Sequence, residues 1–400
     1  MMYWLIQIKR MVEDVFIFPF ILYGKWKARS IPLNKTYDVF FFFPFYHTGG
    51  AEKVHSLIAQ AVKNKKALII FTRRSQDTAF KKDFEAAGHD MIDISKHTDH
   101  KERYWDNLIY RGVFAAYINA QQQPTLVFNG QSNFGYKISR WIRSSIPQIE
   151  LIHSFSSFSY IRMPFLPFYK ETVMISKRRI EDHLTLYRRW GVPSAYDARI
   201  RYIVNGIALP EQKPIPKSGI PGSMLFVGRG TAEKRPMVAA TLAQKLMAAG
   251  VNIRMGFVGD VSQAVDAKVF PQFNMYGNIS DPAILDSIYR EQADLLLVTS
   301  SEEGFPLVIM EAMARGAVII ATPVGDIPVH VQPEKNGWVF SSIYDEEAMF
   351  REALAFIRNL QRNPEEFSRI SAENIAYAYD NFGLPTFVAQ YNTLIENHLR

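Results

Sequence analysis

Two glutamates, Glu303 and Glu311, flank the predicted start of a helix in the C-terminal half of the sequence. An apolar run over 294–299 precedes them, and the order of the pattern predicts a strand, a loop and then the helix. Pro306 suits the first turn of a helix because its missing N–H would have no partner there, and Gly316 suits the C-terminal cap. A ligand at the start of this helix could therefore meet both carboxylates and the unpaired backbone N–H groups.

This combination of groups suits a sugar joined to a nucleotide through a diphosphate. Carboxylates accept hydrogen bonds from neighbouring hydroxyls of a pyranose or a ribose, while the N–H groups and the positive helix end hold the diphosphate. The alternative is that the two glutamates are ordinary solvated side chains on an amphipathic helix. The pair alone does not decide between the two interpretations.

A second motif, Gly228 to Pro236, carries Arg229 and Lys234 directly after another predicted strand. An arginine offers a planar fork of donors and a lysine offers a point charge, so the pair suits two phosphates that must leave a sugar. Judged by spacing alone, two solvated loop cations are the simpler interpretation.

The composition is that of a globular protein long enough for two domains. The chain has 400 residues, of which 48% are hydrophobic and 21% charged, and a formal net charge of +7. This charge is compatible with anionic partners such as nucleotides or phospholipid head groups, but no Lys/Arg run is dense enough to indicate nucleic acid binding. The sequence has no cysteine, which excludes disulfides and cysteine nucleophiles and fits a reducing cytoplasm.

Residues 1–35 form an apolar and aromatic segment. Its apolar residues recur at helical spacing and make one stripe: Trp4, Leu5, Ile8, Met11, Val12, Val15 and Phe16. The apolar runs are well short of the ~20 residues that cross a bilayer, and a convincing signal-peptide cleavage site is missing. Two interpretations stay open: a helix in the membrane interface, which we prefer, or a helix packed on the protein's own surface.

From residue 37 onward, apolar runs alternate with helical periods, which predicts parallel sheets wound by helices. Breaker residues over 206–222 indicate a linker between two such domains. Strands are predicted at 39–43, 67–72, 91–94, 125–129, 150–153, 172–176 and 201–204, and then at 224–227, 252–258, 274–276, 294–299, 317–321 and 338–340.

Taken in order, these motifs resemble those of the family-4 retaining glycosyltransferases, which have the GT-B fold. The resemblance covers nearly everything from about residue 37 onward, and its strength lies in the ordered set, because each motif alone is weak. One departure is 324–329, where the family often has two glycines and a nearby Glu. The resemblance rests on Gly49-Gly50-Ala51-Glu52, His153, Ile175-Ser176, Asn205-Gly206, Gly228-Arg229 to Lys234, Phe257 to Asp260, Tyr276-Gly277 and Glu303 to Glu311.

The resemblance implies a role for each residue of the C-terminal motifs. Glu303 would contact hydroxyls of the donor sugar, and Glu311 would hold the ribose. Arg229 and Lys234 match the phosphate-neutralising pair of the family. The backbone that would lie against the diphosphate belongs to Gly304, Phe305, Pro306, Leu307 and Val308, and the stretch that would border the base to Tyr276 and Gly277.

The N-terminal half is expected to supply His153, Gly49 and Gly50. His153 matches a histidine that points at the donor sugar near the reacting carbon, although a lone histidine at a strand end is more often a structural hydrogen-bonding residue. Gly49 and Gly50 match a glycine loop whose backbone approaches the phosphates. His47 lies close to this loop in the sequence, but no motif includes it.

The implied fold class is α/β, with the GT-B arrangement of two Rossmann-like doubly wound parallel-sheet domains facing a central cleft. An N-terminal acceptor domain is expected over 36–205, after the segment 1–35. The linker 206–222 would join it to a nucleotide-sugar domain over 223–375. The segment 376–400 is expected to contain a helix that returns to the N-terminal domain.

The implied function is a retaining, metal-independent transfer of a sugar from a nucleotide-diphosphate donor, UDP- or GDP-linked, to a glycan or lipid-linked acceptor. No cofactor or metal is expected, because the sequence has no Asp-x-Asp motif for a metal-bridged diphosphate. Surface polysaccharide assembly at the cytoplasmic face of a membrane is the expected setting. The alternatives are an epimerase or phosphorylase of the same fold, or a catalytically silent subunit that binds a nucleotide sugar.

The loop over 155–169 is crowded with Phe, Tyr and Pro around Arg162, and the basic run 177–179 follows it. Together with the aromatic N-terminus, this loop could face anionic lipid. The alternative is a buried hydrophobic loop.

Overall fold

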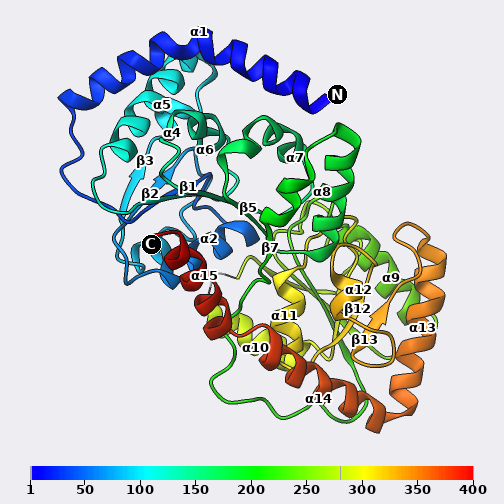
Figure 1. Ribbon diagram of the computed structural model, residues 1–400. Helices are drawn as coiled ribbons and strands as arrows, with labels where there is room; N and C mark the ends of the chain where they lie inside the picture. The colour runs from blue at the N-terminus through cyan, green and yellow to red at the C-terminus, as the bar shows by residue number, and fades with distance from the viewer. Residues whose placement is uncertain (1, 280, 400) are drawn as a thin grey trace. The chain divides into compact units, whose positions relative to one another are not determined.

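The computed structural model describes residues 2–279 and 281–399, and its chain forms two compact units (Figure 1). The N-terminal unit contains the chain up to Val204 together with the segment from Phe387 onward, and the C-terminal unit contains Asn205–Thr386. The predicted linker thus lies within the C-terminal unit, where Ile207 forms a bridge with Gly383. The last helix, α15 (Leu384–His398), extends into the N-terminal unit.

The N-terminal unit is built on a parallel seven-stranded sheet in the order β3-β2-β1-β4-β5-β6-β7. One of its inner strands has the sequence Val-Phe-Phe-Phe-Phe and is buried throughout, as expected for a strand covered on both faces. The strands are β1 (Val39–Phe43), β2 (Ala67–Phe71), β3 (Asp90–Asp93), β4 (Leu126–Asn129), β5 (Gln148–Ile152), β6 (Glu171–Met174) and β7 (Ile200–Tyr202).

Helices and short 3-10 turns connect these strands. They are α1 (Met2–Ser30), α2 (Gly50–Ala61), α3 (Lys81–Glu85), α4 (Ser95–Thr98), η1 (Lys101–Arg103), α5 (Tyr104–Asn119), α6 (Asn133–Ile138), η2 (Ser139–Trp141), α7 (Ser157–Ile161), η3 (Met163–Phe168), α8 (Lys177–Trp190) and η4 (Ser194–Arg199).

Helix α1 is one continuous helix of 29 residues that contains Pro19 and packs along α5 (Figure 1). Its buried side carries Tyr3, Gln7, Arg10 and Gly24, among others. The helix thus packs on the protein's own surface, one of the two interpretations left open, but the apolar stripe found in the sequence faces solvent. We call the exposed apolar residues the outward row: the seven residues of the stripe with Phe18, Leu22, Tyr23 and Trp26. In the part of the chain that the structure describes, no helix is long and apolar enough to cross a membrane.

Two glycines set the close approach of α1 to α5. A Cβ placed on Gly24 would lie 2.0 Å from the carbonyl oxygen of Ile109, and one placed on Gly112 would lie 2.3 Å from that of Ile21. Neither backbone oxygen can move without displacing its helix, so only glycine fits at both positions.

A Gly112→Val substitution is therefore expected to push α1 away from α5. The overpacking should lower the free energy of unfolding by about 1–3 kcal/mol, measured by urea denaturation. Gly50→Ala is the control, because no atom lies within 4 Å of a Cβ built at Gly50. Equal stability of the two variants would contradict the importance of this contact.

The C-terminal unit is built on a parallel six-stranded sheet in the order β10-β9-β8-β11-β12-β13. The strands are β8 (Ser223–Val227), β9 (Arg254–Val258), β10 (Asn274–Gly277), β11 (Leu295–Val298), β12 (Val318–Ala321) and β13 (Gly337–Val339), and the helices are α9 (Pro236–Ala248), α10 (Pro282–Gln292), α11 (Leu307–Met313), α12 (Ile327–His330), α13 (Glu346–Arg362) and α14 (Pro364–Asn381).

Both units therefore have the predicted α/β class, with every predicted strand present and its ends shifted by at most two residues. The core of the C-terminal unit packs α9 and α13 against one face of its sheet. The C-terminal tail is helical, and α13 and α14 separate at Asn363. Proline at the next position fixes this break, since Pro364 is favoured at the start of a helix.

Candidate functional site

The carboxyl edge of the C-terminal sheet has a topological switch point between β8 and β11. From β8 the chain continues to β9 on one side, while β11 lies on the other side. Ligands of open parallel sheets bind where the strand order reverses in this way, outside the carboxyl ends of the strands. The loops that follow these two strands carry Arg229, Lys234 and Glu303, so three predicted site residues lie at the switch point.

Lys234 and Glu303 are in direct contact at this edge. The Lys234 ammonium forms an ion pair with Glu303 Oε1, which also accepts a hydrogen bond of 2.8 Å from Ser300 Oγ. Their side chains are 22% and 11% exposed, so the pair is sheltered but still reaches solvent. The structure thus joins two predicted residues that are far apart in the sequence.

The two loops are tied together below this pair. Thr299 Oγ1 donates to the carbonyl oxygens of Lys234 and Arg235 at 3.1 and 3.0 Å, and the Ser301 N–H donates to the carbonyl oxygen of Glu233 at 2.8 Å. Arg235 has a left-handed backbone with φ of 53°, so the turn places Lys234 by a conformation that few residues adopt. These contacts fix Lys234 and Glu303 on a rigid frame.

Arg229 lies on the same loop but is more exposed. Its guanidinium is 3.3 Å from Glu233 Oε1, and the two side chains are 59% and 40% exposed. An exposed pair of this kind is weak, because water screens it. Arg229 can therefore leave Glu233 and turn toward an incoming phosphate at little cost in stability.

Glu311 lies on α11 and is buried. Its carboxylate accepts a hydrogen bond of 3.1 Å from the Tyr289 hydroxyl of α10, and its carbonyl oxygen accepts one of 2.9 Å from Arg315. Burial, and after it the negative charge of Glu311, raise the pKa of Tyr289 well above its ordinary value. The hydroxyl therefore stays protonated and orients the carboxylate.

The predicted diphosphate-binding stretch is held by a loop that the sequence interpretation treated as a departure from the family. The Asp326 N–H donates to the Gly304 carbonyl oxygen at 2.7 Å. Gly325 has φ of 56°, and a Cβ there would lie 2.0 Å from the same oxygen, so glycine is required. Phe305 turns into the core and stacks on His330 at 4.2 Å between ring centroids.

Pro306 is the N-cap of α11 and not a member of its first turn, which corrects the predicted helix start by one residue. Leu307 and Val308 follow as its first helical residues. Gly316 has φ of 77° after the helix, the left-handed conformation that a C-terminal cap needs.

Tyr276 and Gly277 are the last two residues of the edge strand β10, next to the loop that follows β9. The Gly277 carbonyl oxygen accepts a hydrogen bond of 2.8 Å from the N–H of Gly259, whose φ is 116°. A Cβ on Gly259 would lie 1.9 Å from the Gly228 carbonyl oxygen, so this glycine lets the ends of β8 and β9 approach closely. Tyr276 is half-buried at this edge.

In the N-terminal unit, Gly49 and Gly50 begin α2. A Cβ on Gly49 would lie 2.1 Å from Glu52 Oε2, so the Glu52 carboxylate covers this position. His47 Nε2 is 3.9 Å from Glu52 Oε1, and the His47 ring stacks on Phe45 at 4.3 Å. The histidine that no motif includes therefore belongs to the glycine loop.

His153 is paired with a second histidine that the sequence interpretation missed. His153 Nε2 and His55 Nε2 are 2.9 Å apart, and the buried His55 ring stacks on Phe43 at 4.4 Å. Gly130 makes room for this pair, because a Cβ there would lie 2.6 Å from His55 Nε2. His55 lies on the buried side of α2 with Glu52 and Ser56, so no pattern in the sequence distinguishes it.

The histidine pair gives stability a pH dependence. Burial lowers the pKa of His153 to about 4, and burial together with His153 lowers the pKa of His55. Unfolded histidine titrates near 6.5, so the stabilisation is complete above about pH 6.5 and is lost as the pH falls toward 4.

The free energy of unfolding should therefore fall less between pH 7 and pH 5 in His153→Gln than in the wild type, by about 1 kcal/mol in urea denaturation. His100→Gln, which leaves the pair intact, should keep the wild-type slope; an unchanged slope in His153→Gln would contradict this account.

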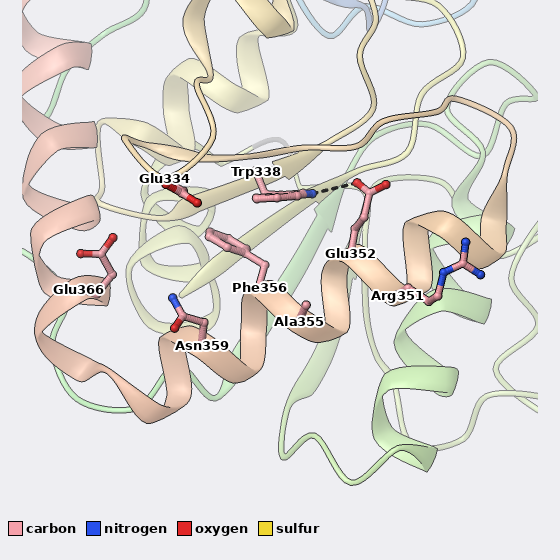
Figure 2. Close-up of a pocket in the computed structure, with 8 residues that line it drawn as sticks. All are labelled: Glu334, Trp338, Arg351, Glu352, Ala355, Phe356, Asn359 and Glu366. Carbon is pink, nitrogen blue, oxygen red and sulfur yellow. Dashed lines mark hydrogen bonds between the residues drawn. The ribbon is translucent and has the colours of Figure 1, made fainter.

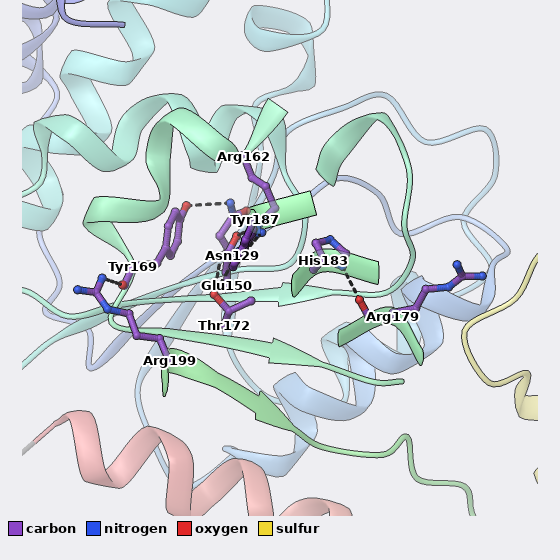
Figure 3. Close-up of polar contacts among 9 residues, drawn as sticks. All are labelled: Asn129, Glu150, Arg162, Tyr169, Thr172, Arg179, His183, Tyr187 and Arg199. Carbon is purple, nitrogen blue, oxygen red and sulfur yellow. Dashed lines mark hydrogen bonds and ion pairs between the residues drawn. The ribbon is translucent and has the colours of Figure 1, made fainter. Parts of the chain in front are cut away.

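Arg162 itself is fully buried and does not face lipid, whereas the loop over 155–169 around it is only partly buried and exposes Tyr160 and Ile161 (Figure 3). Arg162 forms an ion pair with Glu150 of β5, and its Nη1 donates to the Tyr187 hydroxyl at 2.7 Å. Thr172 Oγ1 donates to Glu150 Oε1 at 2.7 Å. These groups satisfy one another inside the N-terminal unit, which identifies them as structural.

A cavity of about 570 Å³ in the C-terminal unit lies against α13 and includes none of the predicted site residues (Figure 2). Its lining carries three carboxylates, Glu334, Glu352 and Glu366, against one guanidinium, Arg351. Glu352 already accepts a hydrogen bond of 3.0 Å from Trp338 Nε1. The negative balance of this lining does not suit an anionic nucleotide, so we place the candidate site at the switch point.

Within residues 2–279 and 281–399, no group of three or more His, Asp or Glu side chains could hold a metal ion.

Comparison with known proteins finds relatives of the C-terminal unit. Residues 211–373, which contain the switch point, match the family model described as "Glycosyl transferases group 1". N-acetyl-alpha-D-glucosaminyl L-malate synthase of Bacillus anthracis is 34% identical over 110 residues, 27% of each chain. D-inositol 3-phosphate glycosyltransferase of Segniliparus rotundus is 26% identical over 226 residues, 51% of this chain and 48% of the relative. The matches thus span about half or less of these relatives.

Solved structures extend the likeness to both units. The structure of Anabaena HepE in complex with UDP has a TM-score of 0.69 at 16% identity, and the match covers 90% of this chain and 100% of HepE. At this identity the likeness shows the fold alone. The chain therefore has the GT-B fold, and its residues 211–373 match the group 1 glycosyl transferases.

Proposed function

We propose that the protein is a retaining, metal-independent glycosyltransferase that moves a sugar from a nucleotide-diphosphate donor to a glycan or lipid-linked acceptor. The observation that carries the proposal is the Lys234–Glu303 pair at the switch point between β8 and β11. A cation for the leaving diphosphate and a carboxylate for sugar hydroxyls are side by side within the segment that matches the family model.

Donor binding would replace the contact between Lys234 and Glu303 with a contact from each residue to the donor. Lys234 would turn from Glu303 to a phosphate oxygen, and Glu303 would accept hydrogen bonds from the sugar hydroxyls, while Ser300 continues to orient the carboxylate. Glu311, oriented by Tyr289, would accept hydrogen bonds from the ribose. The N–H groups of Gly304 to Val308 would face the diphosphate.

Charge then determines the mechanism. Breaking the anomeric carbon–oxygen bond leaves positive charge on the sugar ring and negative charge on the departing diphosphate. Lys234, with Arg229 turning in, would stabilise the second charge without a metal ion. The leaving phosphate would take the proton of the acceptor hydroxyl on the same face, so that the configuration is retained. His153 would contact the sugar near the reacting carbon.

The donor is proposed to be UDP- or GDP-linked, and the similarity to a structure that binds UDP supports the first. Surface polysaccharide assembly at the cytoplasmic face of a membrane is the proposed setting, supported by the resemblance of the ordered motifs.

Thermal-shift screening with UDP-, GDP-, ADP- and CMP-sugars in the presence of EDTA tests donor binding. One class should raise the apparent Tm, because a ligand at 100 times its Kd adds about 2.7 kcal/mol to the stability of the folded state. Release of free nucleotide from that donor should then be measured. If none of the donors shifts Tm, or binding needs added metal, the proposal is contradicted.

A further inference from the structure

Helix α1 exposes a long apolar row to solvent, while its buried side includes two polar residues, Gln7 and Arg10. Phe16 is 75% exposed and Val15 is 71% exposed, whereas Arg10 and Gln7 are buried. Gln7 Nε2 donates to the Pro164 carbonyl oxygen at 3.1 Å, and Arg10 Nη1 donates to Asp14 at 2.8 Å. This is the reverse of the usual arrangement of a surface helix, so the outward row is available to an apolar environment.

The outward row has the composition of a helix in a membrane interface. It extends over most of a 29-residue helix, about 43 Å long at 1.5 Å per residue. Trp4 lies near one end, and Tyr23 and Trp26 lie near the other, with aliphatic and Phe side chains between them. Trp and Tyr prefer the depth of the head groups, and the apolar side chains between them suit the acyl-chain boundary. Trp105 of α5 is also exposed and stacks on Phe20 at 4.8 Å, which widens the apolar surface.

A cationic cavity of about 550 Å³ lies beside the outward row, between α1, α5 and α6. Arg111 and Lys137 line it, and Arg111 donates to Asn107 Oδ1 at 2.8 Å. Among the described residues, no carboxylate lies within 4.0 Å of either cation. Burial lowers the pKa of both Arg111 and Lys137. Two sheltered cations with no carboxylate in direct contact favour an anionic ligand.

The two carboxylates of this cavity are already engaged. Asp14 is paired with Arg10 at 2.8 Å and with Arg140 at 3.6 Å, and Glu13 is 3.8 Å from Lys9. The lining therefore keeps a positive balance, which would attract a phosphate group.

We propose that α1 lies flat in the interface of an anionic membrane, with the outward row among the acyl chains, and that the cavity beside it receives the phosphate of a lipid head group. This docking surface goes beyond the proposed transfer reaction and does not depend on it.

A second copy of the chain is a poorer occupant of the outward row. The helix ends with Lys25, Lys27 and Arg29, while near its start Lys9 is matched only by Glu13. Two copies packed through this row would bring cations together at one or both ends, and neither copy would supply an anion to Arg111 and Lys137. A membrane with anionic lipids satisfies both requirements.

Flotation with vesicles tests the outward row in the full chain. The wild type should float with phosphatidylcholine vesicles that contain phosphatidylglycerol, and Val12→Gln/Phe16→Gln should lower the bound fraction on the order of tenfold or more, since two inserted side chains are lost. Ile215→Gln/Val269→Gln is the matched control, because these residues are equally apolar and exposed but lie in the C-terminal unit, and it should float as the wild type does. Circular dichroism verifies that each variant is folded, and Trp26→Gln provides a second variant of the row. Equal flotation of the wild type and the row variants would overturn the proposal.

The cavity is tested separately. Lys137→Gln should reduce the preference for vesicles with phosphatidylglycerol over pure phosphatidylcholine, and Lys137→Arg should restore it. Inorganic phosphate at millimolar concentration should not release the bound protein, because the outward row contributes most of the affinity; release would indicate a site for free phosphate and contradict the lipid assignment.

Sedimentation equilibrium without vesicles should show a monomer. A dimer that dissociates in Val12→Gln/Phe16→Gln would show instead that a second copy covers the row and would overturn the proposal.

Discussion

Replacing Lys234 with alanine is expected to lower the rate of donor cleavage by about 10²–10³-fold, the loss typical of removing one group that stabilises a developing negative charge. Lys234 is held at the switch point by the Thr299 contacts of its loop and pairs with Glu303, so only its side chain has to turn when the donor binds. The effect should appear in kcat, measured as release of nucleotide at saturating donor, because the diphosphate charge develops only as the bond breaks.

Lys245→Ala is the matched control for this variant. Lys245 also lies in the C-terminal unit and also pairs with a glutamate, Glu347, but on the exposed side of α9. The control removes the same charge from the same unit and should retain wild-type kcat. If Lys234→Ala and Lys245→Ala have equal rates, Lys234 does not act on the leaving group.

The largest expected effect on stability belongs to Arg162→Met. Arg162 and Glu150 are fully buried and are paired with each other, so removing the guanidinium leaves an uncompensated carboxylate in the core. The free energy of unfolding should fall by about 3–5 kcal/mol in urea denaturation.

Arg188→Met provides the comparison, since Arg188 pairs with Asp197 at an exposed position of the same unit. An exposed pair contributes about 0–1 kcal/mol, so this variant should remain close to the wild type. The double variant Glu150→Gln/Arg162→Met should recover part of the loss, because the buried charge disappears with its partner. A double variant less stable than Arg162→Met would show that the pair is not the source of the effect.

The sheets could be predicted because their strands are continuous apolar runs separated by helical periods. The Phe-rich β1 and the Leu-rich β11 are examples, and both are inner strands of their sheets. The order of the motifs along the chain also placed Lys234 and Glu303 at carboxyl ends of strands. Strand order then brings those ends together, although no spacing in the sequence shows the contact itself.

Contacts that depend on tertiary packing could not be predicted. His55 meets His153 from a helix 98 positions away in the sequence, and a lone histidine on the buried side of a helix has no distinctive spacing. Arg162 stood among aromatic residues that suit a lipid surface as well as a core, and only the position of Glu150 on β5 shows that Arg162 is buried. The direction of α1 was ambiguous for the same reason, because both of its sides contain residues that can be buried.

Hydrogen exchange of the backbone amides, with and without the nucleotide sugar that most raises Tm, would show where the donor binds. If the donor binds at the switch point of the C-terminal sheet, amides in 228–236 and 299–311 should exchange more slowly in its presence, and this protection should weaken in Lys234→Ala. Protection confined to 351–366, the segment that lines the α13 cavity, would contradict donor binding at the switch point. The absence of any change in the two switch-point loops would contradict it as well.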